Sequence, residues 1–466
     1  MGKYKRLLSN TAILGAGTFT SKVLVFLLMP LYTALLSTEQ FGTADILMQT
    51  ANLIIPLAVL GINDGLFRFA LDAGDEKKKQ IFTNMLFVYI AGIIPLAIVI
   101  QLLRLIDVFS GYIWLVFFYI CAANLHSLCA NYIRACNKTK TFALQGILNT
   151  AFTIVLNVLF LVVFNMGVLG YVLSVAIADL ITTVFIFFFN KLYGQIVFEK
   201  PDTELITSIL KFSLPYIPTT LMWMITSASD RFIVSMFSGV AENGLYAAAY
   251  KIPTLISLAG TVFIEAWQFS SVNDAAPSER TKFFGRVYKS YTGIMFIGTS
   301  ALIALSKVFT VLLLDDAYYS SWQYVPVLGI AMLFSAFSSF MGSVYFVEKR
   351  SERMLLTASI GALTNVVLNF VLIPQGGAMG ASVATVISYV VMFIIRNGDT
   401  AKYIKFDLCI PRIIINAIAL IAQTVIMIAE PRGWVYWQIA FAVFFLLFNG
   451  KDLLQMLLDL LKKEKK

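Results

Sequence analysis

Twelve ionisable side chains interrupt long apolar stretches of this 466-residue sequence. A charge at such a depth in hydrocarbon is costly unless it faces a partner or a water-filled chamber. Seven of the twelve are basic, namely Lys22, Arg68, Arg134, Lys211, Arg231, Lys251 and Lys307. The five acidic ones are Asp45, Asp64, Asp179, Asp230 and Glu265. Bases in a wet chamber can hold an anion such as a phosphate, and a buried acid can bind H+ or Na+.

Chemistry that needs a metal, a nucleotide or a nucleic acid has little support in the sequence. There is one histidine, His126, and the four cysteines lack paired metal-ligand spacing, so we expect no metal site and no cofactor. No Walker motif is present, which argues against direct use of ATP. The net charge of +9 comes from basic residues spread over many loops, whereas nucleic-acid-binding proteins gather them on one face. We therefore expect no nucleic-acid partner.

The elements that must position these charges are transmembrane helices. Hydrophobic residues make up 59% of the sequence and charged residues 13%, about half the charged share of a soluble domain. Helices are expected because a bilayer offers no water to unpaired backbone groups. Apolar runs predict about fourteen of them, near 11–35, 43–70, 81–103, 112–134, 143–165, 168–190, 208–237, 244–270, 287–313, 323–347, 354–373, 378–396, 410–429 and 434–450. The predicted fold class is an all-α polytopic membrane protein.

The basic residues between these spans predict their orientation. With the N-terminus inside, cytoplasmic segments carry 26 of the 35 Lys and Arg residues, Arg396 among them. External loops carry two, Arg104 and Arg432. Because positive charge is retained on the cytoplasmic side, both termini are expected to be cytoplasmic.

An internal repeat relates the two halves of the sequence. Val155–Asn157 and Gly167–Gly170 are matched by Val367–Asn369 and Gly377–Gly380. Six spans separate the copies, so both halves keep one orientation, which predicts a parallel pseudo-twofold repeat of two six-helix lobes. The expected organisation is an N-lobe at 1–190, a cytoplasmic linker at 191–207, a C-lobe at 208–398, and two extra spans with a basic tail at 399–466.

Nine of the twelve charges fall on the first two spans of each half, at 11–35, 43–70, 208–237 and 244–270. Prolines, which are expected to bend these spans, occur at Pro30, Pro56, Pro215, Pro218 and Pro253. We interpret the four spans as the lining of a central hydrated cavity that opens to alternate sides.

Structural explanations compete with this interpretation at several positions. Asp64 and Arg68 are one helical turn apart and can neutralise each other. Lys251 and Glu265, by contrast, are fourteen residues apart and return to nearly the same helix face, so both are expected to face the cavity at opposite depths. Snorkelling at span ends explains Arg134, Lys211 and Asp45. Packing roles are expected for three residues on other spans, His126, Asp179 and Lys307. For His126 a proton relay is the alternative, which the pKa of a histidine would suit.

The N-terminal part of the sequence resembles a known family. The runs Leu8–Thr11, Phe26–Thr33 and Phe41–Asp45, together with Lys22, are similar to the opening of bacterial polysaccharide-biosynthesis proteins. These are the oligosaccharide-lipid flippases of the multidrug/oligosaccharidyl-lipid/polysaccharide exporter superfamily. The resemblance implies MATE-like lobes, alternating access, a place in the bacterial cytoplasmic membrane, and an undecaprenyl-diphosphate-linked oligosaccharide as substrate. Fourteen spans also resemble the lipid II flippase and sporulation branches.

The resulting hypothesis is an ion-gradient-driven flippase for cell-surface polysaccharide synthesis, not an enzyme. The predicted substrate-binding residues are Lys22, Arg68, Arg231 and Lys251, and the coupling candidates for H+ or Na+ are Asp64, Asp230 and Glu265. One alternative is a multidrug/cation antiporter of the same superfamily, which would favour an acidic cavity. Another is a polyprenyl-sugar-using glycosyltransferase or ligase, in which Asp315 and Asp316 would form a metal-binding pair. Besides the sugar lipid and the ion, membrane lipids are the expected partners.

Overall fold

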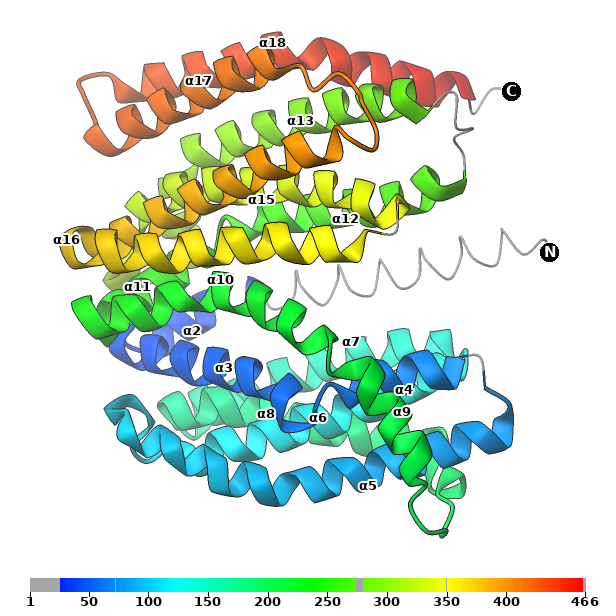
Figure 1. Ribbon diagram of the computed structural model, residues 1–466. Helices are drawn as coiled ribbons and strands as arrows, with labels where there is room; N and C mark the ends of the chain where they lie inside the picture. The colour runs from blue at the N-terminus through cyan, green and yellow to red at the C-terminus, as the bar shows by residue number, and fades with distance from the viewer. Residues whose placement is uncertain (1–25, 72, 274–279, 349, 464–466) are drawn as a thin grey trace. The chain divides into compact units, whose positions relative to one another are not determined.

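The computed structural model describes residues 26–463 apart from 72, 274–279 and 349 (Figure 1). In these residues all regular structure is helical, in seventeen α-helices joined by short 3-10 and π segments. The chain divides into two compact units, residues 1–228 and 229–466, with the boundary inside helix α10 (Tyr216–Ser238). The lobes and linker expected from the sequence stay predictions.

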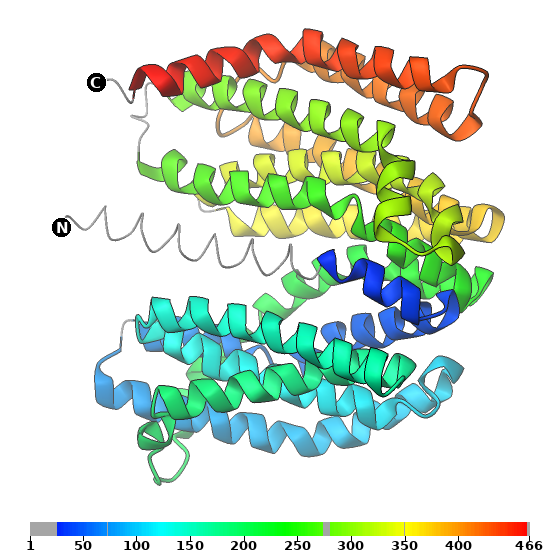
Figure 2. The same ribbon diagram turned by 180° about the vertical axis from the view of Figure 1, so that it is seen from behind.

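Unit 1 is a bundle in which α6 packs against α3, α4, α5, α7 and α8. Figures 1 and 2 show α5 to α8 side by side from opposite directions. The α-helices are α2 (Met29–Leu35), α3 (Thr38–Ala58), α4 (Ile62–Leu71), α5 (Asp75–Val99), α6 (Ile113–Ala135), α7 (Thr139–Asn157), α8 (Gly167–Phe189) and α9 (Thr203–Ser213). The shorter elements are η1 (Ile100–Leu105), η2 (Asp107–Phe109), η3 (Val158–Val163) and η4 (Leu192–Gln195).

The entry to unit 1 shows how local sequence sets helix boundaries. Ser37 and Gln40 form a reciprocal capping box that starts α3. The predicted span 43–70 is broken after Pro56, where Leu60 and Gly61 adopt positive φ angles of 51° and 67°, and α3 meets α4 at 52°. After this bend in the chain, buried apolar side chains of α4 pack with those of α5, α6 and α9 to form the core of the unit.

Unit 2 is built around α15, which packs against α12, α13 and α16. The buried face of α15 carries aromatic rings. The ring centre of Phe337 lies 5.3 Å from that of Phe296 on α13 and 5.9 Å from that of Phe393 on α16. The elements are α11 (Val240–Lys251), α12 (Thr254–Asn273), α13 (Arg280–Ala304), α14 (Ser306–Leu313), η5 (Asp316–Gln323), α15 (Tyr324–Val347), α16 (Ser351–Thr400), α17 (Ile410–Ala429) and α18 (Trp434–Lys463).

Broken helices change the expected geometry of two stretches in unit 2. The predicted span 244–270 is two helices, because α11 ends at Lys251 and α12 begins at Thr254, on either side of Pro253. The expectation that Lys251 and Glu265 share one helix is therefore wrong. The predicted spans 354–373 and 378–396 form α16, which bends at Gly377, where φ is 54° and ψ is −137°.

Arg396 is not a loop residue, as the orientation argument assumed. It lies within α16 with none of its side chain exposed. Its Nη1 donates to the Ser338 carbonyl oxygen of α15 at 2.8 Å, and its Nε donates to Thr357 Oγ1 at 3.0 Å. Burial with matched hydrogen bonds gives this base a packing role that hydropathy alone did not indicate.

The last two helices lie along α13 (Figure 1). Gln423 of α17 donates to the Ser300 carbonyl oxygen of α13 at 3.1 Å and to Gln438 of α18 at 3.0 Å. Arg412 and Asn449 also join α17 to α18, with Nη2 donating to Oδ1 at 2.9 Å. A polar seam therefore fastens both helices to unit 2.

Length and composition fit a multi-pass membrane protein. Seven helical segments of the described residues are long and apolar enough to cross a bilayer, or up to nine if each of two bent pairs counts as one span. One such pair is α13 and α14, which meet at 65°.

Candidate functional site

A buried carboxylate lies at the centre of a polar cluster in unit 2. Asp230 of α10 is fully buried. Its Oδ2 accepts hydrogen bonds from the Tyr246 hydroxyl at 2.6 Å and from the Thr385 hydroxyl at 3.0 Å. Its Oδ1 accepts from Asn369 Nδ2 and Ser229 Oγ, each at 3.4 Å. Three helices, α10, α11 and α16, therefore meet at one carboxylate.

Two asparagines of α16 extend this cluster and bring further oxygens to it. Asn365 and Asn369 lie one turn apart and are fully buried. Asn365 Oδ1 accepts from Ser229 Oγ at 2.8 Å and from Asn369 Nδ2 at 3.0 Å. Asn369 Oδ1 has no hydrogen-bond donor among the described residues. Half a turn of the Asn369 amide exchanges its oxygen and nitrogen, which points Oδ1 at the oxygens of Asp230 and Asn365.

In that orientation the cluster offers only hard oxygen ligands to a cation: one carboxylate, amide oxygens and hydroxyls. A single carboxylate balances a single positive charge, which suits Na+ or H+ better than a divalent ion. Across the described part of the chain, no three His, Cys, Asp or Glu side chains gather in a way that could hold a metal ion. The Asp230 cluster is therefore a candidate site for a monovalent cation.

Arg231 points away from its neighbour Asp230, toward two tyrosines of α11. Its side chain is buried, and its guanidinium carbon lies 4.5 Å from the Tyr250 ring centre and 5.6 Å from that of Tyr246. Such cation–π contacts stabilise a charged side chain away from bulk water. Tyr246 thus contacts the acid through its hydroxyl and the base through its ring.

The other residues expected to form the site have different environments. Asp64 and Arg68 are exposed on α4 of unit 1. Lys251, the last residue of α11, is half-buried. Lys22 and the side chain of Glu265 lie outside the described residues. Among predicted residues with described side chains, Asp230 and Arg231 share a contacting residue, Tyr246.

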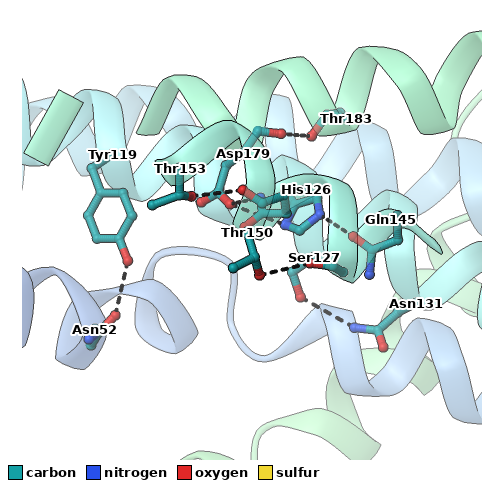
Figure 3. A network of polar contacts seen from close by, with 12 residues as sticks. Asn52, Tyr119, His126, Ser127, Asn131, Gln145, Thr150, Thr153, Asp179 and Thr183 are labelled. Atoms are coloured by element: carbon teal, nitrogen blue, oxygen red, sulfur yellow. Dashed lines mark hydrogen bonds and ion pairs between the residues drawn. The ribbon is translucent and has the colours of Figure 1, made fainter. Parts of the chain in front are cut away.

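A second polar cluster lies in unit 1, between α6, α7 and α8 (Figure 3). His126 Nδ1 is 3.4 Å from Asp179 Oδ1, and His126 Nε2 is 2.7 Å from Gln145 Oε1. Asn149 Nδ2 donates to the same Asp179 oxygen at 2.8 Å. The sole histidine of the chain is therefore held between an acid and an amide.

Sequence reasoning assigned separate packing roles to His126 and Asp179 and missed their contact. The signal that could have revealed it lies in the neighbouring span, where polar residues recur at every fourth position: Gln145, Asn149, Thr153 and Asn157. This spacing places a polar stripe on one face of α7. A polar stripe in an apolar span indicates polar partners on the adjacent helices.

Comparisons with known proteins agree with this architecture. Residues 7–267 match a family model described as polysaccharide biosynthesis protein. An uncharacterized membrane protein of Methanocaldococcus jannaschii is 21% identical over 400 residues, which are 80% of this chain and 93% of the relative.

Two solved structures share the fold at 14% sequence identity. The lipid II flippase MurJ, in an inward closed conformation, has a TM-score of 0.75 and matches 96% of this chain and 100% of its own. An inward-facing multidrug resistance MATE family transporter of the MOP superfamily has a TM-score of 0.66 and matches 82% of this chain and 95% of its own. These similarities support a MOP-like membrane fold.

Proposed function

Because the chain belongs to the polysaccharide biosynthesis protein family, we propose that it is an ion-gradient-driven flippase and not an enzyme. Its substrate is an undecaprenyl-diphosphate-linked oligosaccharide, moved across the bacterial cytoplasmic membrane by alternating access for cell-surface polysaccharide synthesis. The observation that carries the proposal is the fully buried Asp230 with its oxygen-rich surroundings. The fold shared with a lipid II flippase supports it.

Cation binding belongs to the Asp230 cluster in this proposal. Taking a carboxylate out of water is costly, and a bound Na+ or H+ lowers that cost. With the cation bound, the cluster fastens α10 and α11 to α16, because all three helices contribute ligands or hydrogen bonds. A cation that binds one arrangement of these helices more tightly shifts the population toward it, which is what a gradient needs to drive transport. Asp64 is exposed, so of the two coupling candidates with described side chains the observations favour the buried Asp230.

The neighbouring Arg231 gives this ion coupling a route to the substrate. Without a cation, the charges of Asp230 and Arg231 balance each other across Tyr246. A cation bound to Asp230 neutralises the carboxylate in place of Arg231. The guanidinium can then move from the Tyr250 ring to the diphosphate. Guanidinium groups bind phosphates through two parallel hydrogen bonds. Lys22, Arg68 and Lys251 are the further bases assigned to the diphosphate.

The test is a flipping assay in proteoliposomes with a polyprenyl-diphosphate-linked sugar, under separately imposed Na+ and H+ gradients. One gradient should accelerate flipping by the wild-type protein, and Asp230→Asn should abolish that acceleration. Arg231→Gln should instead weaken binding of undecaprenyl diphosphate, by about 10- to 150-fold, the scale of a hydrogen bond to a charged group.

The matched control is Asp316→Asn, which makes the same chemical change at an exposed position. Variants are compared only when they elute as monodisperse protein of equal thermal stability. The proposal fails if Asp230→Asn and Asp316→Asn respond equally to the gradients. Transport of lipophilic cations without sugar-lipid flipping would favour the multidrug antiporter.

A further inference from the structure

The cluster around His126 joins three helices of unit 1, yet the proposed function gives it no task. His126 lies on α6, Gln145 and Asn149 on α7, and Asp179 on α8 (Figure 3). The side chains of His126 and Asp179 are 18% and 12% exposed. The pair is therefore largely buried within the described part of unit 1.

Hydrogen-bond chemistry makes this pair a site for one proton. Where Gln145 Oε1 is the acceptor in the 2.7 Å contact, His126 Nε2 carries the hydrogen. The other nitrogen, Nδ1, then has only a lone pair when the ring is neutral, and it faces Asp179 Oδ1 at 3.4 Å. An ionised carboxylate also presents lone pairs there, so two acceptors oppose each other. One added proton, on either atom, turns the opposition into a hydrogen bond.

Helix α7 fixes both partners in the orientation that this chemistry needs. Gln145 holds the ring, and Asn149, one turn later, donates to Asp179 Oδ1 at 2.8 Å. Thr150 and Thr153 of the same helix donate to the backbone carbonyl oxygens of Gly146 and Asn149. When it is protonated, the pair connects α6 to α8, and the side chains of Gln145 and Asn149 on α7 hold both partners in place.

Few other groups near the pair change charge in the pH range in which histidine titrates. Tyr119 of α6 interacts with Asp179 and with Tyr171 of α8. The other titratable groups on α3, α4, α5 and α6 are Glu39, Asp45, Asp64, Arg68, Asp75, Glu76, Lys77, Lys78, Lys79, Tyr89, Cys121, Cys129, Tyr132 and Arg134. Tyrosines stay neutral and arginine stays charged near neutral pH. Asp45 of α3 interacts with Tyr171, and Asp64 of α4 is exposed and interacts with Arg134. On α7 no ionisable residue follows Lys140 before the helix ends at Asn157.

We propose that His126 and Asp179 form a proton-binding site in unit 1, which is separate from the Asp230 cluster of unit 2 and makes flipping pH-dependent. Proton uptake strengthens the contact between α6 and α8, and proton release weakens it. The two residues titrate as one coupled system. Proton binding stands on the geometry of unit 1 alone, whereas its link to flipping rests on the proposed function.

The single histidine allows a direct test by NMR spectroscopy. In protein labelled with nitrogen-15 at histidine, the imidazole resonances belong to His126 and report its protonation. Their chemical shifts should change with pH as the pair binds and releases its proton. Asp179→Asn should move the midpoint, because it removes a charge in contact with the ring. Asp107→Asn, the same change at an exposed position of η2, should leave the midpoint in place.

Two NMR outcomes would overturn the proton site. One is an imidazole that stays neutral over the whole range, with the hydrogen on Nδ1, which would mean that Gln145 donates to the ring. The other is a midpoint that responds to Asp179→Asn no more than to Asp107→Asn.

The link to flipping is tested with the same variants in proteoliposomes, at a fixed gradient of whichever ion accelerates wild-type flipping and with the pH varied equally on both sides. The pH profile of wild-type flipping should follow the NMR midpoint, and the profile of Asp179→Asn should move with its own midpoint. Unchanged profiles beside a moved midpoint would overturn the link. If the wild-type protein flips no sugar lipid at any pH, the proposed function fails, and the NMR titration still decides whether the proton site exists.

Discussion

The Tyr246 hydroxyl donates a 2.6 Å hydrogen bond to Asp230, while its ring centre lies 5.6 Å from the guanidinium carbon of Arg231. One fully buried tyrosine therefore contacts an acid and a base that are adjacent in sequence but point in different directions. A change in the charge of Asp230 therefore alters the hydrogen bond from Tyr246, and through the Tyr246 ring it alters the electrostatic environment of Arg231.

Tyr246→Phe removes the hydrogen bond and keeps the ring. Because the acceptor is a buried carboxylate, we expect the free energy of unfolding to fall by about 1.5–3 kcal/mol. The measurement is reversible unfolding in mixed detergent micelles, followed by circular dichroism. Tyr436→Phe is the matched control, since Tyr436 is 79% exposed on α18 and should tolerate the change. Equal losses in the two variants would argue against a special role for the Asp230 contact.

Asn369 should set how strongly Na+ stabilises unit 2. Asn369→Asp places a second carboxylate beside Asp230, 3.4 Å from its Oδ1 in the present contact, and a bound cation relieves the repulsion between them. Asn369→Ala removes a ligand. We therefore expect NaCl, compared with choline chloride at equal ionic strength, to raise the melting temperature most in Asn369→Asp and least in Asn369→Ala. The same Na+ effect in both variants and the wild-type protein would count against a cation at this position.

Lys307 has the packing role that its predicted place on an outer span indicated. It forms an ion pair with Glu430, and its Nζ lies 4.4 Å from the Trp322 ring centre and 4.9 Å from that of Trp434. Each cation–π contact is worth about 0.5–1 kcal/mol, and the partly exposed ion pair adds little. Lys307→Ala should lower the free energy of unfolding by about 1–2 kcal/mol, and Glu430→Gln by less. Chemical unfolding of both single variants and the double variant measures the coupling, and no loss in Lys307→Ala would show that the ring contacts do not stabilise the fold.

Arg396→Lys should destabilise unit 2 although it keeps the charge. The guanidinium donates in different directions, to Ser338 at 2.8 Å and to Thr357 at 3.0 Å, and a lysine ammonium cannot reproduce that fork. Each buried hydrogen-bonding group left without its partner costs about 1–3 kcal/mol. The yield of monodisperse protein and its melting temperature should both fall. The exposed Arg104→Lys serves as the control, and a wild-type melting temperature in Arg396→Lys would contradict this account.

The sequence alone determined the class of the fold and the bounds of several of its apolar helices. The predicted spans 112–134, 168–190 and 410–429 agree within one residue at each end with α6, α8 and α17. This works because the length of a span follows from bilayer thickness and local composition, both of which are readable in a short window of sequence. The N-terminal motif likewise indicated the family that the comparison over residues 7–267 confirms.

The tertiary structure decided which charged and polar groups meet. His126 and Asp179 were assigned separate packing roles, Asp230 has a partner 155 residues away in Thr385, and Arg396 is buried instead of exposed in a loop. Hydropathy places a residue within the bilayer but does not say which faces of two helices pack together. That choice depends on small residues, bends and hydrogen bonds contributed by distant parts of the chain, such as the bend at Gly377 in the helix that supplies Asn369 and Thr385.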